Sequence, residues 1–155
     1  MILSAQSIRK LCIPACGYNP PMIMPFYERT VHFGLSFGLG PAGYDIRIAE
    51  AITLATGAFS LASSIEHLYI PIDIQGELKD KSTWARKGLA VQNTVFDPGF
   101  RGFATLELTN HSSTEIIIPY GIAIAQMIFE ELDEPTEIPY KGKYQDQGAG
   151  PQEAR

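Results

Sequence analysis

The chain has 155 residues, about the size of one domain, and its 45% hydrophobic and 19% charged residues exclude wholesale disorder. Its formal net charge of −5 argues against a broad surface for nucleic acid or anionic membranes, but leaves room for a small phosphate pocket. We therefore expect a globular domain that binds neither nucleic acid nor membranes.

The N-terminal region predicts a short helix followed by irregular chain. Residues 1–10 lack the charged leader and apolar block of a signal peptide, so we expect a cytoplasmic protein. Residues 4–11 predict an amphipathic helix with Ser4 as its N-cap. Residues 12–28 are rich in proline, which favours irregular structure.

The cysteines and histidines are too scattered to predict a zinc site. Cys12 and Cys16 flank Pro14, which spoils a helical face, and no second Cys or His pair has ligand spacing. The histidines lie far apart, as His32, His67 and His111. Zinc-dependent nucleobase deaminases need a cluster of His and Cys around a metal-activated water. We therefore expect no zinc, and we interpret the cysteines as reduced thiols.

Strand patterns dominate the rest of the chain. Fourteen glycines and eleven prolines indicate many turns between short elements. Strands are predicted over residues 43–48, 59–63, 65–70, 72–78, 103–109, 115–118 and 122–129. The most apolar stretch, residues 116–129, is interrupted at Pro119 and Gly121 and does not predict a membrane span. Many short strands predict an all-β sandwich or jelly-roll-like barrel with one or two short helices.

A second short helix is predicted over residues 81–87, and its start is suited to an anion. Lys81 precedes two hydroxyl residues, Ser82 and Thr83, and Arg86 follows one turn later. Free amide groups and the helix dipole favour negative charge at such a start, and the two cations would add to the attraction. A capped surface helix with solvated cations explains the same residues equally well.

Two acidic residues further along the chain are candidates for chemistry. Asp97 stands before a Pro-Gly pair, which is typical of a turn. On the strand over residues 103–109, a period of two places Glu107 on the same face as Thr105 and Thr109, opposite two leucines. Such a face is commonly exposed. If it lines a pocket instead, Glu107 is partly desolvated and suited to general acid–base catalysis.

The last residues of the chain change character. Residues 141–155 are polar, rich in Gly, Gln and Lys, and show no apolar period. Most segments of this kind are frayed termini, and composition favours that interpretation. The alternative is a lid that orders over a bound ligand. We therefore divide the chain into a β domain, residues 1–140, and a C-terminal tail, residues 141–155.

Seven segments, taken in order, resemble the deoxycytidine triphosphate (dCTP) deaminase family and its sister family, the dUTPases. The matching blocks are MILS at 1–4, GYDIR at 43–47, KSTWAR at 81–86, DPGFRG at 97–102, TLE at 105–107, IAQ at 124–126 and KYQDQ at 143–147. They span nearly the whole chain. No single block is decisive, but the ordered set is specific.

This resemblance implies a distorted jelly-roll or β-barrel of the dUTPase type, assembled as a homotrimer with three sites between subunits. The substrate would be a deoxynucleoside triphosphate that carries Mg²⁺ on its phosphates, with no metal site of the protein's own and no zinc. The implied reaction is hydrolytic deamination of dCTP to dUTP and ammonia, in pyrimidine deoxynucleotide metabolism. The enzyme class would be a hydrolase that acts on the C–N bond of a cyclic amidine.

The resemblance also implies residue roles. Glu107 would shuttle protons and activate water for attack on C4 of cytosine. Ser82 and Arg86 would position that water, bind phosphate and stabilise developing charge. Lys81 stands where the family usually has arginine, and it keeps the charge without the bidentate fork. The other implied substrate contacts are Thr83, Asn93, Thr94, Asp97 and Gln126, together with Lys143, Tyr144 and Gln147, which would close over the triphosphate.

Three functions remain open on the sequence. Glu107 favours a deaminase, because dUTPases have an apolar residue there and end in a Gly-rich, Arg-containing motif that this tail lacks. Asp97 stands where dUTPases place the carboxylate for phosphoanhydride cleavage, so a dUTPase or a bifunctional deaminase and diphosphatase is the alternative. A non-catalytic nucleotide-binding regulator is the third. The loop of residues 87–96 is slightly shorter than in the best-known deaminases, which leaves base preference and inhibition by dTTP open.

Overall fold

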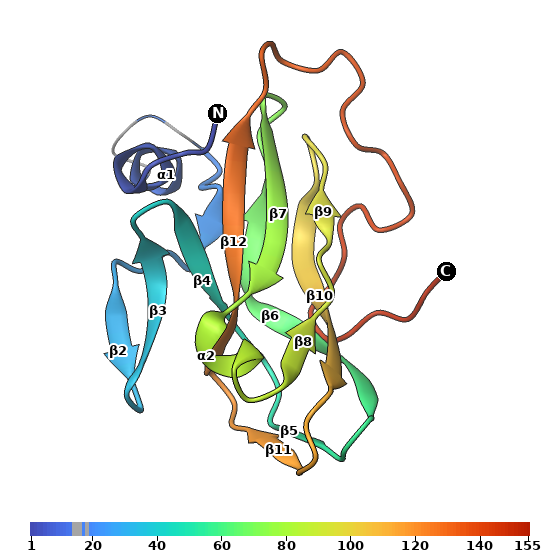
Figure 1. Ribbon diagram of the computed structural model, residues 1–155. Helices are drawn as coiled ribbons and strands as arrows, with labels where there is room; N and C mark the ends of the chain where they lie inside the picture. The colour runs from blue at the N-terminus through green and yellow to red at the C-terminus, as the bar shows by residue number, and fades with distance from the viewer. Residues whose placement is uncertain (14–16, 18) are drawn as a thin grey trace.

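Strands account for most of the regular structure, as the sequence patterns predict. The computed structural model describes residues 1–13, 17 and 19–155, and Cys16 lies outside them. Within these ranges there are two helices, α1 (Ala5–Cys12) and α2 (Ser82–Ala85), beside two main sheets (Figure 1). Neither helix has the length and apolar character needed to cross a membrane.

Helix α1 forms where the sequence predicts it. The carbonyl oxygen of Ser4, the N-cap residue, accepts hydrogen bonds from the backbone amides of Ser7 and Ile8, each at 3.0 Å. The Ser4 side chain caps no amide. Ile8 and Cys12 are buried and hold the helix against the domain. Burial raises the pKa of the Cys12 thiol to about 12, so this thiol stays protonated and unreactive.

The larger sheet contains six antiparallel strands. Across the sheet they run in the order β2 (Thr30–His32), β3 (Leu35–Gly40), β4 (Gly43–Arg47), β12 (Ala123–Glu131), β7 (Ile74–Asp80) and β9 (Val95–Phe96). The β2–β3 hairpin projects from the domain (Figure 1), and β2 is exposed along its whole length. The sequence patterns predict β4, β7 and β12 but miss β2, β3 and β9, which are edge strands or rich in glycine.

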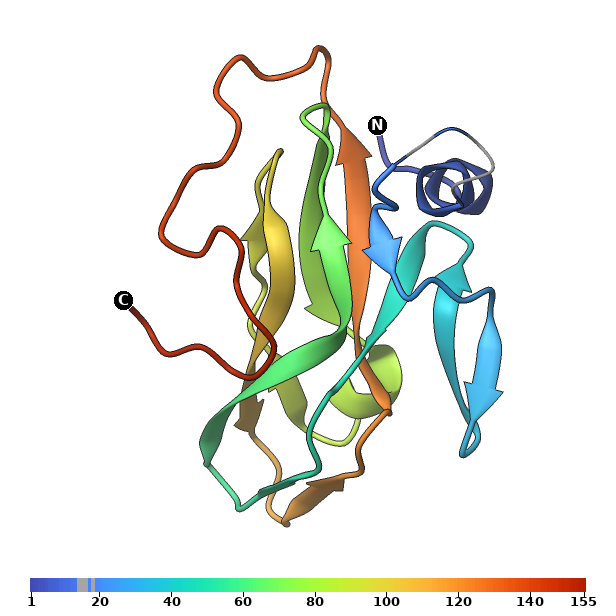
Figure 2. The same ribbon diagram turned by 180° about the vertical axis from the view of Figure 1, so that it is seen from behind.

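The second sheet contains four strands, in the order β1 (Ile23–Met24), β6 (Phe59–Tyr69), β10 (Arg101–Asn110) and β8 (Leu89–Val91). A separate pair, β5 (Ile52–Leu54) and β11 (Ile116–Ile118), lies at one end of the molecule (Figure 2). Strand β6 runs unbroken through the two segments that the sequence patterns separate. One hydrophobic cluster joins both sheets, so the fold is the jelly-roll-like, all-β arrangement that was predicted.

A buried ion pair connects the two sheets. Glu66 on β6 is fully buried, and its carboxylate accepts hydrogen bonds from Arg47 Nε at 2.7 Å and from the Arg47 backbone amide at 2.9 Å. The Arg47 guanidinium lies 4.7 Å from the ring centroids of both Tyr27 and Phe37. Removing one partner of such a pair leaves a buried charge unpaired, at a cost of about 3–5 kcal/mol.

Candidate active site

Strand β10 forms one wall of a cavity of about 450 Å³. Among the residues that the sequence singles out, this cavity brings together Thr94, Asp97, Glu107, Tyr144 and Gln147. Much of the remaining lining is apolar and includes Phe59, Leu61, Val95, Phe96 and Phe100. The cavity therefore combines carboxylates with a largely apolar surface, a combination common in small-molecule sites.

The alternation of β10 places the Glu107 side chain in this cavity. Ala104, Leu106 and Leu108 are buried in the core, whereas Glu107 lies on the opposite, partly exposed face of the strand. Directly across from it on β6 is Leu61. The predicted period of two is therefore confirmed, and the face that carries Glu107 lines a pocket rather than open surface.

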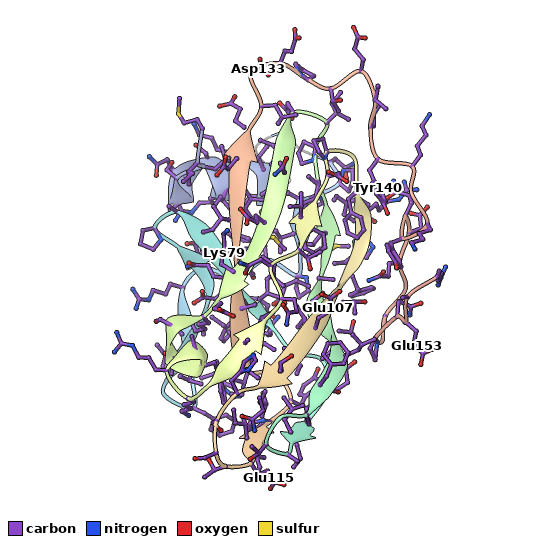
Figure 3. The ribbon with its side chains drawn as sticks, turned by 45° about the vertical axis from the view of Figure 1, so that its right-hand side comes forward. Lys79, Glu107, Glu115, Asp133, Tyr140 and Glu153 are labelled. Carbon is purple, nitrogen blue, oxygen red and sulfur yellow. The ribbon has the colours of Figure 1, made fainter. Side chains whose placement is uncertain are left out.

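The tail lies along β10 instead of extending into solvent. The backbone amide of Phe103 donates to the carbonyl of Gln147 at 3.0 Å, and the side-chain amide of Gln145 donates to the carbonyl of Gly99 at 2.9 Å. Arg101 forms an ion pair with Asp146, which lowers the pKa of that carboxyl. In Figure 3, Tyr140 and Glu153 lie on the segment that runs past Glu107, and all three residues line the cavity.

Lys81 and Ser82 lie in a different and more polar pocket of about 270 Å³, together with Gln126. The Lys81 ammonium donates to the Asp45 carboxylate and to Ser36 Oγ, the latter at 3.3 Å. Lys81 and Asp45 are each only 11% exposed at the side chain. Gln126 Nε2 donates to Asp45 Oδ1 at 3.5 Å. The cation is thus held in a network centred on a carboxylate that the sequence analysis did not select.

The remaining predicted residues line neither cavity. Arg86 and Asn93 are exposed on the surface, and Thr83 is half-buried on α2. Lys143 is also exposed, and its ammonium donates to the carbonyl of Arg155. Helix α2 ends at Ala85, so Arg86 forms its C-cap and the helix is shorter than predicted. One chain therefore holds the predicted site residues in two separate groups, with Arg86 outside both.

Several residues at these two sites escaped the sequence analysis. Asp45 belongs to the GYDIR block, and that position was the one available signal for it. Ser36 lies on a strand that the patterns did not predict. Phe59 and Leu61 lie on a predicted strand, but only the pairing of β6 with β10 brings them beside Glu107.

Comparison with known proteins decides the family. A family model described as dCTP deaminase-like matches residues 41–132. The dCTP deaminase of Campylobacter curvus is 34% identical, over 84% of this chain and 88% of the relative. That of Thermococcus sibiricus is 32% identical, over 94% of this chain and 92% of the relative. The chain belongs to the dCTP deaminase family.

This member of the dCTP deaminase family also shares its fold with dUTPases. One solved structure superposes with a TM-score of 0.58. It is a mutant dUTPase from phage phi11 of S. aureus, and that structure describes the coordination of a structural Mg(II) ion. The match covers 76% of this chain and 91% of the dUTPase at 17% identity. At that identity the likeness establishes a common fold and no more.

Within the described ranges, no three His, Cys, Asp or Glu side chains converge to form a metal site. Mg²⁺ bound to a nucleotide needs only about one or two protein carboxylates, with phosphate oxygens and water as its other ligands. Asp97 lines the cavity of about 450 Å³ and could supply one such carboxylate.

Proposed function

We propose that this chain catalyses the hydrolytic deamination of dCTP to dUTP and ammonia. The observation that carries the proposal is the position of Glu107, whose carboxyl group lines a cavity within the usual size range of small-molecule sites. Leu61 lies directly across from it, and the tail runs along the same strand. Membership of the dCTP deaminase family supports this assignment.

In the proposed reaction Glu107 moves protons between water and the cytosine ring. The carboxylate takes a proton from water as the oxygen adds to C4, and it delivers this proton to N3. It then takes the hydroxyl proton of the tetrahedral intermediate and transfers it to the amino group, which leaves as ammonia. Water is consumed, C4 becomes a carbonyl, and Glu107 returns to its starting state. We propose that no zinc takes part, since the cysteines and histidines lack ligand spacing.

We further propose that the enzyme is a homotrimer with sites between its subunits. The separation of Glu107 from Lys81 and Ser82, which line different cavities, supports this arrangement. Arg86 is exposed and therefore available to a neighbouring copy. In such a site one subunit would supply Glu107 and the tail. The next would supply the cations and Ser82 for the phosphates and for the attacking water.

A second activity, cleavage of the triphosphate to release pyrophosphate, is favoured by one observation. Asp97 lines the same cavity as Glu107 and is exposed, so a water molecule can reach its carboxylate. The chain would then act on dUTP, or on dCTP in two steps. Mg²⁺ on the phosphates would neutralise charge during either reaction.

The proposal is tested by incubating the protein with each deoxynucleoside triphosphate and Mg²⁺, with ammonia and pyrophosphate measured separately. We expect ammonia from dCTP. Glu107→Gln should lower its rate by roughly two to four orders of magnitude while nucleotide binding survives. Glu153→Gln is the matched control, because Glu153 lines the same cavity from the tail. Wild-type protein that releases no ammonia from any nucleotide would contradict the deaminase assignment.

The same assay separates the second activity. If wild-type protein releases pyrophosphate from dUTP, Asp97→Asn should abolish that release and leave a folded trimer. Absence of pyrophosphate from every nucleotide would return Asp97 to the role of a turn residue.

Zinc is examined by measuring the metal content of the active protein, in which we expect less than one zinc per site.

A further inference from the structure

The hydroxyl group of Thr105 joins the tail to the strand that carries Glu107. Thr105 Oγ1 accepts a hydrogen bond from Gln147 Nε2 at 2.7 Å and another from the backbone amide of Gln152 at 3.3 Å. Thr105 and Glu107 are two residues apart on β10, so their side chains lie on the same face of the strand. Two separate points of the tail thus meet at one side chain of the cavity wall.

The start of β10 is also shaped to receive the tail. Gly102 forms a parallel bridge with Gln147, and its φ of +145° is a conformation that residues with a side chain rarely adopt. A Cβ atom on Gly102 would lie 2.7 Å from the backbone nitrogen of Gln147 and 2.9 Å from its carbonyl oxygen. The tail backbone therefore approaches β10 as closely as a glycine permits.

Gln147 directs its side-chain amide at this strand. Its Nε2 donates to the Phe103 carbonyl at 2.8 Å as well as to Thr105. Both hydrogens of the amide group are thereby bound to β10. Of these two acceptors, only the Thr105 hydroxyl can be removed by mutation without changing the backbone.

We propose that Thr105 is a positioning residue, whose hydroxyl holds the tail on β10 and so determines how firmly the tail covers Glu107. The inference rests on the proposed function only where it concerns turnover, because docking of the tail is measurable without it. Thr105 acts through Gln147 and Gln152, and takes no part in proton transfer. Weaker docking leaves the cavity open for more of the time and exposes the reacting groups to water.

Docking is tested first by limited proteolysis. Trypsin has two sites in the tail, after Lys141 and Lys143, and loss of the C-terminal peptide is followed by mass. Thr105→Val should speed this cleavage by about tenfold, since two hydrogen bonds to the tail are lost. Thr105→Ser keeps the hydroxyl and should cleave within about twofold of wild type. Thr109→Val is the matched control, with the same change on the same face of β10 and, among the described residues, no hydrogen bond to the tail.

A double-mutant cycle separates the specific contact from a general loosening of the strand. Gln147→Leu alone should also speed cleavage. In the Gln147→Leu background, Thr105→Val should add clearly less than it does alone, because only the longer hydrogen bond from the Gln152 amide, at 3.3 Å, is then left to lose. Effects that simply multiply would show that Thr105 does not hold the tail through Gln147, and would overturn the proposal.

Kinetics provide the second readout. For the reaction that the wild-type protein catalyses, Thr105→Val should lower kcat/KM by about tenfold. Thr105→Ser keeps the hydroxyl and should have a kcat/KM close to that of wild type. The pH–rate profile of Thr105→Val should match that of wild type, since Glu107, the group that transfers protons, is intact. Cleavage at the wild-type rate in Thr105→Val, or an equal effect of Thr109→Val, would overturn the inference. A wild-type protein without deaminase activity would overturn the proposed function but leave the proteolysis result valid.

Discussion

The cavity at Glu107 and the pocket at Lys81 are built from different strands and hold different chemistry. The first lies over β6 and β10 beneath the tail, with three carboxylates, Asp97, Glu107 and Glu153, against aromatic and aliphatic side chains. The second lies over β3, β4 and β12, where polar groups surround the ion pair of Lys81 with Asp45. The first suits a pyrimidine ring, and the second suits phosphates.

Under the proposed function, this difference is what one copy of the chain would lack. A cavity rich in carboxylates disfavours a triphosphate without a bound cation, and Glu107, the proposed proton shuttle, does not line the polar pocket. In the proposed site each half needs the other, and within one chain the two groups of residues line different pockets. A second copy that brings its Lys81 pocket to the Glu107 cavity would supply the missing half.

The sharpest test of that comparison mixes two inactive proteins. Glu107→Gln removes the first half of the site and Ser82→Ala damages the second. If sites form between subunits, co-refolded mixtures should regain about a quarter of wild-type activity, because about a quarter of interfaces then combine two intact halves. Light scattering should show about three chains per particle. Activity no higher than that of the separate variants would place both halves within one chain.

Removing the tail should have the next largest effect. A chain that ends at residue 140 loses Tyr144 and Gln147 from the cavity wall and the charge of Lys143. We expect kcat/KM to fall by about a hundredfold. The melting temperature should change by no more than about a few degrees, because most tail contacts are polar. Unchanged kinetics would show that the tail has no role in the site and is the frayed end that its composition favours.

Substitution of Lys81 tests the polar pocket. Lys81→Met leaves the Asp45 carboxylate without its cation where phosphate is expected to bind, so KM for the nucleotide should rise by roughly tenfold or more. Lys79→Met is the control, because Lys79 forms a more exposed ion pair with Glu77 on β7. A similar KM for both variants would remove Lys81 from the substrate site.

The smallest effect concerns the pH dependence of stability and His67 on β6. Burial, and then the nearby Arg101, lower the pKa of His67 below its ordinary value of 6.5, while Asp146 opposes that shift. The folded state therefore prefers neutral His67, and this contribution to stability is present above pH 6.5 and lost as the pH falls through the lower folded pKa. His67→Gln should reduce the fall in melting temperature between about pH 7.5 and 5.5 by roughly one or two degrees. An unchanged pH dependence in the variant would contradict this assignment.

Local pattern was enough to predict the long strands and the face of Glu107, because β10 alternates strictly between core and cavity. Pattern was not enough for Asp45, whose significance depends on Lys81 approaching from 36 positions further along the chain. The same holds for the tail. Its composition predicts fraying, yet the side-chain amide of Gln145 donates to the Gly99 carbonyl just before β10, and that of Gln147 donates to a carbonyl and a hydroxyl on β10. Polar contacts between distant segments leave no periodic trace in a sequence.

The position of β12 has a consequence for how the molecule is made. It is the last strand along the chain, yet it lies in the interior of the six-stranded sheet, where it pairs with β4 on one side and β7 on the other. Until residues 123–131 have been synthesised, β4 and β7 therefore present unpaired edges, which can pair with other chains and aggregate. Gln126 arrives with β12, and the tail follows it. Both halves of the candidate site are thus completed only at the end of synthesis. The six-stranded sheet depends on pairings between distant segments, so it cannot form fully until β12 is available.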